Sequence, residues 1–148
     1  MKSKEFLIKA IIPQDDSCIT YTVYLYCDDL RILLPITTNR HAVESMLFAK
    51  TMQSSLRPSL FNTVKRVLLS LDASVVSIEI YKCLDEIFYA YIVVKNALSI
   101  YHIDAKVTDA ICFAFEFRVS IVVYSEVYEN FGIHVTKELL ERSMSSIN

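Results

Sequence analysis

The sequence contains a single glycine, Gly132, among its 148 residues. Loops that bind nucleotide phosphates, such as GxGxxG and GxxxxGK, need several glycines, because their backbone approaches the phosphate where a Cβ would clash. The common classes of ATP, GTP and NAD enzyme are therefore excluded by composition, and no nucleotide cofactor is expected.

Long hydrophobic segments are also missing. The longest apolar stretch covers residues 87–94 and ends at Lys95, which is well short of the roughly 20 residues that cross a bilayer. The N-terminal segment carries charges among its apolar residues and lacks the hydrophobic region and cleavage site of a signal peptide. We expect a cytoplasmic protein that has no membrane partner.

The cysteines form no CxxC pair, which a zinc knuckle would require. They are expected to be reduced and mostly buried thiols. The four positions are Cys18, Cys27, Cys83 and Cys112.

What the sequence does contain is a large apolar fraction, 53% of all residues. A chain of this length typically forms one domain with a substantial core. An apolar content this high indicates a large core, a surface hidden in an oligomer, or both. Because obligate homodimer interfaces resemble a core cut in half, we expect a homodimer.

The first half of the chain is predicted to form three strands followed by two helices. Residues 19–27 are rich in β-branched and aromatic side chains, which favour strands. Asn39 is a suitable N-cap for the first helix, and the second helix begins near Ser59 with an apolar stripe that includes Val67 and Leu71. The predicted strands cover residues 5–12, 19–27 and 31–36.

From residue 73 the hydrophobic period changes to two, because Val76, Ile78 and Ile80 alternate with polar residues. Local hairpins then extend this strand into an antiparallel meander. A buried helix with Thr108 as its N-cap is expected to follow, although residues 113–119 are also compatible with a strand. If they are helical, the helix completes a βαβ unit near residues 98–124. The later elements are strands over residues 87–95, 98–105 and 120–124 and a helix over residues 108–117.

These patterns predict one α+β domain with a mixed, mostly antiparallel sheet and three to four helices. We expect the domain to cover residues 1–132. Residues 133–148 are expected to form a C-terminal amphipathic helix, over residues 135–145, and a frayed tail.

Charge is unevenly distributed along the chain. Residues 31–71 contain six basic side chains and one acid, Glu44, although the whole chain has a net charge of −2. A local positive surface can attract a polyanion, so a weak nucleic-acid contact is one interpretation. The other is an ordinary solvated helix face, or a face paired with the acidic part of a partner subunit.

The segment IDAKVTDA, residues 103–110, concentrates polar side chains where a strand meets a helix. Strand alternation places His102 and Asp104 on one face, while Asp109 falls in the first helical turn, near Lys106 and Thr108. Two adjacent carboxylates can hold Mg²⁺ or Mn²⁺, and such an ion could activate water against a phosphodiester. The alternative is that these carboxylates only satisfy amides and neighbouring donors.

Several blocks of sequence, in their order and spacing, resemble the bifunctional nuclease (BFN) domain family over residues 5–132. The blocks are LPI at 34–36, Arg57-Pro58 at the head of a helix, FYAYIVV at 88–94, IDAKVTDAICFAF at 103–115 and VSIVVYSEV at 119–127. The resemblance implies a small α+β domain that dimerises, and some relatives cleave RNA and DNA.

The chain departs from the family pattern at three polar positions. Phe61 stands where the family has a histidine, Asn62 stands where it has an aspartate, and Ala42 stands where it has an acid. Phenylalanine cannot act as a general base, and asparagine removes a charge from any metal site.

Two hypotheses follow from the resemblance. In the first, the chain is a metal-assisted nuclease in which Asp104 and Asp109 hold the ion and His102 shares a face with Asp104. Lys106 and Arg57 would then contact the substrate phosphate. In the second, it is a catalytically inactive dimeric binding module with the same fold.

Overall fold

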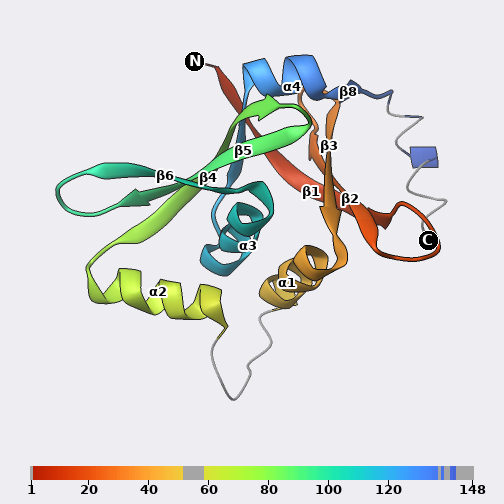
Figure 1. The fold of residues 1–148 in the computed structure, drawn as a ribbon. Coiled ribbons are helices and arrows are strands. Elements are labelled where there is room, and N and C mark those ends of the chain that lie inside the picture. Colours follow the sequence, from red (N-terminus) through yellow and green to blue (C-terminus); the bar gives the residue numbers. More distant parts are fainter. Residues whose placement is uncertain (1, 52–58, 137, 139–140, 143–148) are drawn as a thin grey trace.

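The fold is built on one mixed β-sheet that is partly covered by helices (Figure 1). The computed structural model describes residues 2–51, 59–136, 138, 141 and 142, and these contain eight strands and four helices. The strands are β1 Ser3–Pro13, β2 Thr20–Cys27, β3 Ile32–Asn39, β4 Ser74–Leu84, β5 Ile87–Lys95, β6 Ile100–Lys106, β7 Ile121–Tyr124 and β8 Ile133–His134. The helices are α1 Arg40–Thr51, α2 Leu60–Ser70, α3 Val107–Phe117 and α4 Ser125–Phe131.

The strands lie in the order β6-β5-β4-β7-β1-β2-β3-β8. The pair of β4 with β7 is parallel, and the other pairs are antiparallel. The sequence prediction of a single α+β domain with a mixed, mostly antiparallel sheet is therefore confirmed.

The crossover from β6 through α3 to β7 forms the predicted βαβ unit. β6 and β7 run in the same direction, because two antiparallel steps lead from β6 to β4 and β7 is parallel to β4. The two strands are not neighbours, since β5 and β4 lie between them. The other two strands of the meander, β4 and β5, therefore lie between the two parallel strands of the unit.

Strand alternation sorts side chains between a core face and an outer face. Ile78 and Ile80 of β4 are fully buried, as a period of two requires. The prediction for Val76 is wrong, because a register shift between Val75 and Ser77 turns Val75 inward and leaves Val76 42% exposed. An extra residue of this kind is a β-bulge, which reverses the alternation on one side of it.

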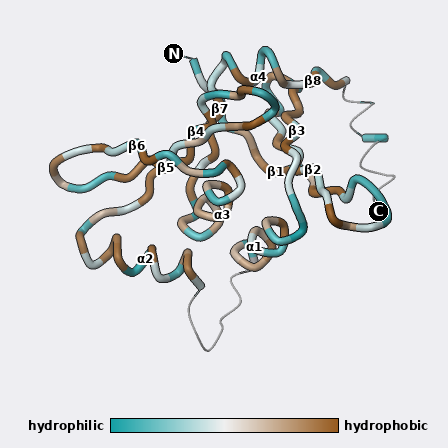
Figure 2. Tube along the Cα trace, viewed as in Figure 1, coloured by the Kyte–Doolittle hydropathy of each residue, from teal (hydrophilic) through white to brown (hydrophobic). Residues whose placement is uncertain are grey.

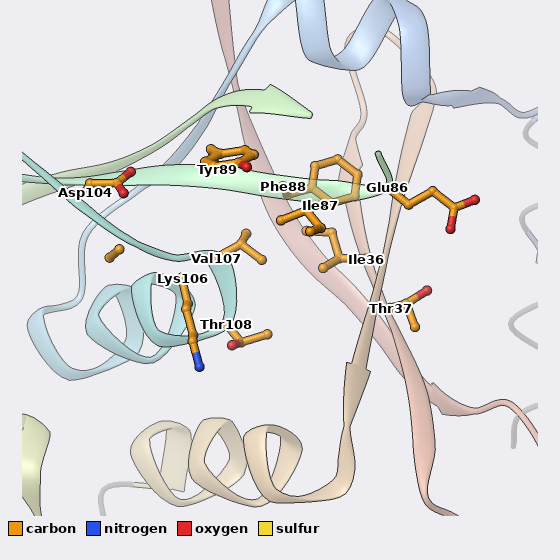
Figure 3. Close-up of a pocket in the computed structure, with 11 residues that line it drawn as sticks. Ile36, Thr37, Glu86, Ile87, Phe88, Tyr89, Asp104, Lys106, Val107 and Thr108 are labelled. Atoms are coloured by element: carbon orange, nitrogen blue, oxygen red, sulfur yellow. The ribbon is translucent and has the colours of Figure 1, made fainter. Parts of the chain in front are cut away.

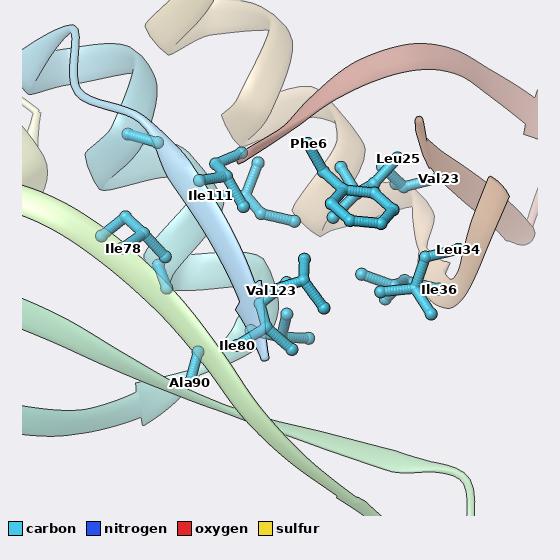
Figure 4. Close-up of a cluster of buried hydrophobic side chains, with 14 of the residues drawn as sticks. Phe6, Val23, Leu25, Leu34, Ile36, Ile78, Ile80, Ala90, Ile111 and Val123 are labelled. Carbon is cyan, nitrogen blue, oxygen red and sulfur yellow. The ribbon is translucent and has the colours of Figure 1, made fainter. Parts of the chain in front are cut away.

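The core lies between the sheet and α3 (Figure 4). α3 supplies buried residues on much of its surface, which agrees with the predicted buried helix. Cys27 and Cys112 are buried, Cys18 and Cys83 are partly exposed, and all four are free thiols. The largest fully buried side chains include Phe6, Leu25, Leu34, Ile36, Ile78, Ile80, Ile111 and Val123.

Side-chain caps begin two of the helices, and the cap at Asn39 is the one that the sequence predicts. The backbone N–H of Ala42 donates to Asn39 Oδ1 at 2.9 Å, and that of Asn62 donates to Ser59 Oγ at 3.1 Å. The predicted N-cap of α3 is wrong. The cap position is Lys106, without a side-chain hydrogen bond to the helix, because the helix begins one residue earlier than Thr108.

α1, α2 and α3 lie together on one side of the sheet (Figure 1). Hydrophobic residues recur along α2 (Figure 2), but none of its residues is buried. In the predicted apolar stripe Val67 is 51% exposed and Leu71 is 68% exposed. Phe61 and Leu68 are the α2 residues that pack against the core cluster.

Two short elements near the C-terminus were not anticipated from the sequence. α4 follows β7 directly and buries Val127 and Tyr128. β8 pairs with β3 through Ile133 opposite Leu33. The predicted C-terminal helix over residues 135–145 and the tail from 143 fall largely outside the described residues. Among the residues that are described, no helix is long and apolar enough to cross a membrane.

We predict that Gly132→Ala destabilises the fold. A Cβ at this position would collide with the Ile32 side chain and with the carbonyl oxygen of Tyr128, and overpacking of this kind costs about 1–3 kcal/mol. Chemical denaturation should show a lower free energy of unfolding. The exposed turn variant Ser99→Ala should change that free energy by less than about 0.5 kcal/mol. Equal values for the two variants would contradict this account.

Candidate functional site

A cavity of about 500 Å³ lies between α1, the start of α2 and α3, and we call it the helical cavity. Its volume is within the range of roughly 300–1,000 Å³ that is typical of small-molecule sites. Apolar side chains and a few polar ones share its wall. The lining residues are His41, Ala42, Glu44, Ser45, Phe48, Ser59, Leu60, Phe61, Thr108, Asp109 and Cys112.

A second cavity, of about 360 Å³, lies where β6 turns into α3, and we call it the junction cavity (Figure 3). Ile36 and Phe88 form part of its apolar wall, and Asp104, Lys106 and Thr108 are among its polar residues. In Figure 3 the Lys106 side chain extends away from Asp104. The two residues therefore line one cavity without pointing toward each other.

The two predicted metal ligands line different cavities. Asp104 belongs to the junction cavity, whereas Asp109 belongs to the helical cavity. Within the described part of the chain, no three His, Cys, Asp or Glu side chains form a group that could hold a metal ion. The structure therefore does not bring Asp104 and Asp109 together in one cavity.

The outer face of the sheet carries a network of hydrogen-bonded tyrosines, which we call the tyrosine face. It lies opposite the core face, because Glu79 and Tyr91 alternate with buried residues along β4 and β5. Tyr81 and Tyr91 stack with ring centroids 3.8 Å apart. The residues that define this face are Glu79, Tyr81, Tyr91, His102, Asp104 and Tyr124.

His102 and Asp104 lie on the tyrosine face together, which confirms the prediction that they share a face. Asp104 Oδ1 accepts a hydrogen bond from the Tyr81 hydroxyl at 2.9 Å. His102 Nε2 lies 3.6 Å from Glu79 Oε1, and the same oxygen accepts the Tyr124 hydroxyl at 2.5 Å. Both predicted site residues therefore have partners within this network rather than in the helical cavity.

The pKa values of two tyrosines in this network, Tyr81 and Tyr124, are raised, which favours their neutral form. Burial and then the hydrogen bond to Glu79 are the largest causes that together raise the pKa of Tyr124 to about 12. Burial, followed by the hydrogen bond to Asp104, also raises the pKa of Tyr81. Ionisation of either tyrosine would place a phenolate beside a carboxylate, which is unfavourable.

The basic residues of segment 31–71 are partly engaged in local contacts. Arg40 Nε lies 3.2 Å from Glu44 Oε1 in an exposed i,i+4 pair. Lys65 Nζ donates to the Glu116 carbonyl oxygen at 3.4 Å and lies 5.8 Å from the Phe117 ring centroid. Arg57, the predicted phosphate contact, is outside the described residues.

His41 and Glu44 are not among the site residues that the sequence predicts. Both line the helical cavity together with Asp109. They are three residues apart in a predicted helix and therefore lie on one face. This spacing is the signal in the sequence that could have identified them. Nothing local indicated that this face would point toward α3.

Residues 23–136 match the family model described as the bifunctional nuclease domain. The chain belongs to the bifunctional nuclease domain family. The match covers most of the chain and includes both cavities and the tyrosine face. A search of curated proteins finds none that matches the chain.

The helical cavity is lined by positions at which this chain departs from, or agrees with, the pattern of the BFN family. Three positions of the family pattern, Ala42, Phe61 and Asp109, line this one cavity. Phe61, at the family's histidine position, packs edge-on against Phe113 with centroids 5.0 Å apart. Asn62, at the aspartate position, donates from Nδ2 to Glu116 Oε1 at 3.3 Å.

We predict that the tyrosine face makes stability depend on pH in the alkaline range. A tyrosine whose pKa is higher in the folded state contributes stability below its usual pKa of about 10, and this contribution is lost as the pH rises toward the folded value. For Tyr124 the window is therefore from about pH 10 to about 12. The free energy of unfolding should fall less steeply across it in Tyr124→Phe than in the native sequence.

Glu79→Gln provides an independent check of the same interaction. Removing the carboxylate should lower the pKa of Tyr124, and ultraviolet titration of the phenol would detect the change. Unfolding profiles of equal slope in Tyr124→Phe and the native sequence would contradict the prediction.

Proposed function

We propose that this chain is a non-catalytic binding member of the BFN family, and that the helical cavity is its ligand site. The observation that carries this proposal is that Phe61 and Asn62, which stand at motif positions of the family, make contacts that hold α2 against α3. Phe61 packs against Phe113, and the Asn62 side chain donates from Nδ2 to Glu116 Oε1. Side chains that stabilise α2 in this way supply neither a general base nor a metal-binding carboxylate.

The lining of the helical cavity indicates the class of ligand. Phe48, Phe61 and Cys112 offer an apolar wall, while Glu44 and Asp109 offer carboxylate oxygens. An apolar wall with a few convergent polar groups is the usual make-up of a small-molecule site. The ligand we expect is a small molecule with an apolar body and an amine or another hydrogen-bond donor.

A metal-assisted nuclease is the second candidate, and two observations favour it. The chain belongs to a nuclease family, and Asp109 shares the helical cavity with Glu44 and His41. In this candidate Mg²⁺ or Mn²⁺ would supply charge stabilisation at the phosphodiester. The basic segment 31–71 would provide the weak nucleic-acid contact.

The two candidates differ in a nuclease assay with single-stranded RNA and DNA, with and without Mg²⁺ or Mn²⁺. We expect the native protein to cleave no faster than Asp109→Asn. Asp104→Asn is the matched control, because its carboxylate lies on the tyrosine face and outside the helical cavity. Metal-dependent cleavage that is lost in Asp109→Asn and kept in Asp104→Asn would overturn the proposal in favour of the nuclease.

The structural role of position 61 can be measured separately. Phe61→Ala removes a half-buried ring and its edge-on partner contact, so we expect a loss of about 1–2 kcal/mol in the free energy of unfolding. Leu60→Ala is the neighbouring control, since Leu60 is 74% exposed and should cost less than about 0.5 kcal/mol. If Phe61→Ala were as stable as Leu60→Ala, position 61 would not be a packing position.

A further inference from the structure

The junction cavity has an apolar floor that belongs to the core. Ile36 is 1% exposed and Val107 is 8% exposed, and the half-buried ring of Phe88 packs against the same core cluster. All three line the cavity, and Figure 3 shows them between β5, β3 and the start of α3. Because core residues hold this floor in place, it can accept an apolar group without rearrangement.

A cation lies on the α3 side of this floor. Lys106 is exposed, and its ammonium group forms no ion pair and no hydrogen bond with the described residues. Although it is the N-cap residue of α3, its side chain makes no hydrogen bond to the helix. The Thr108 hydroxyl lines the cavity as well, and in Figure 3 both side chains lie beneath Val107. An ammonium group and a hydroxyl are suitable donors for a carboxylate.

A carboxylate lies on the strand side of the same cavity. The Tyr81 hydroxyl donates to Asp104 Oδ1 at 2.9 Å, which fixes the orientation of the carboxylate. The other oxygen, Oδ2, accepts no hydrogen bond from the part of the chain that the structure describes. Because Lys106 extends away from Asp104 in Figure 3, the two side chains do not pair with each other. Asp104 therefore offers an acceptor to an ammonium group of a ligand.

We infer that the junction cavity binds a zwitterion of one class, an α-amino acid with an apolar side chain. The ligand carboxylate binds Lys106 and Thr108, its ammonium group binds Asp104, and its side chain covers Ile36 and Phe88. The cavity volume of about 360 Å³ is within the range of small-molecule sites. This site is separate from the helical cavity and does not rest on the function proposed for that cavity.

The charges around the cavity disfavour ligands with only one sign of charge. A simple carboxylate with the same apolar body would meet Lys106 but would also lie close to Asp104, and like charges in proximity are unfavourable. An amine would have the reverse difficulty. Glu86 lines the cavity too, but in Figure 3 its side chain extends away from Ile36 and Ile87, so we assign the ammonium contact to Asp104.

The exposure of both charged groups limits the affinity. Water screens each exposed ionic contact, so each contributes only moderately to binding. For a ligand of this size we therefore expect a dissociation constant of about 0.1–1 mM. Affinities in this range can be measured by NMR titration of backbone amides.

Titration with leucine and two analogues tests the ligand class. Isocaproate lacks the ammonium group and isoamylamine lacks the carboxylate, but both keep the apolar body. We expect leucine to bind about fivefold or more tightly than either analogue. The amide signals of Ile87 and Ala105 in the junction cavity should shift on binding, whereas those of Ala42 and Ser45 in the helical cavity should not.

Two variants separate the contacts to the two charges. Lys106→Gln should weaken the binding of leucine and isocaproate about fivefold and should not weaken that of isoamylamine. Asp104→Asn should weaken leucine and isoamylamine and should not weaken isocaproate. Lys95→Gln is the matched control, because Lys95 is an exposed lysine at the opposite end of β5, and it should leave leucine binding unchanged. Circular dichroism would show that the three variants are folded.

Three results would overturn the inference. One is the absence of shifts at Ile87 and Ala105 with leucine at about ten times the expected dissociation constant. Another is equal leucine affinity in Lys106→Gln and Lys95→Gln. The third is an isocaproate affinity equal to that of leucine, which would reject the zwitterion. The nuclease assay is independent of all three results, so this site and the proposed function of the helical cavity fail separately.

Discussion

The parallel contact between β7 and β4 joins two halves of the sheet that come from distant parts of the chain. Ile121 and Val123 of β7 are buried and pair with Ile78 and Ile80 of β4, while the other edge of β7 pairs with β1. A parallel strand cannot follow its neighbour through a tight hairpin, so the chain needs a crossover. α3 supplies that crossover, and its burial beneath the sheet forms the centre of the core.

The position of α3 decides where the polar residues of the β6–α3 turn can act. Asp104 still obeys strand alternation and bonds to Tyr81 on the outer face. Five residues later, Asp109 follows helical geometry and lines the cavity that α1 and α2 share with α3. A segment that is compact in sequence is thus divided between two surfaces, which is why its carboxylates serve different environments.

The wall of the helical cavity depends on how α2 is attached to α3. α2 has no buried residue, so its attachment depends on a few contacts to α3. Phe61 and Asn62 make two of these contacts. Replacing polar motif residues with residues that contact α3 would stabilise the attachment of α2. The same replacement would remove reactive groups from the cavity. We propose that this exchange produced a binding site with an apolar wall.

The sequence by itself determined the local features: the strands with alternating residues, the meander, the cap at Asn39, the start of a helix near Ser59, and the shared face of His102 and Asp104. These depend on neighbours along the chain, so periodicity and capping chemistry are sufficient to predict them. The tertiary structure alone decided the order of the strands and the exposure of α2. It also decided that Asp104 and Asp109 line different cavities and that His41 lines the helical cavity. Each of these depends on contacts between segments far apart in sequence, and a single sequence carries no record of which distant segments meet.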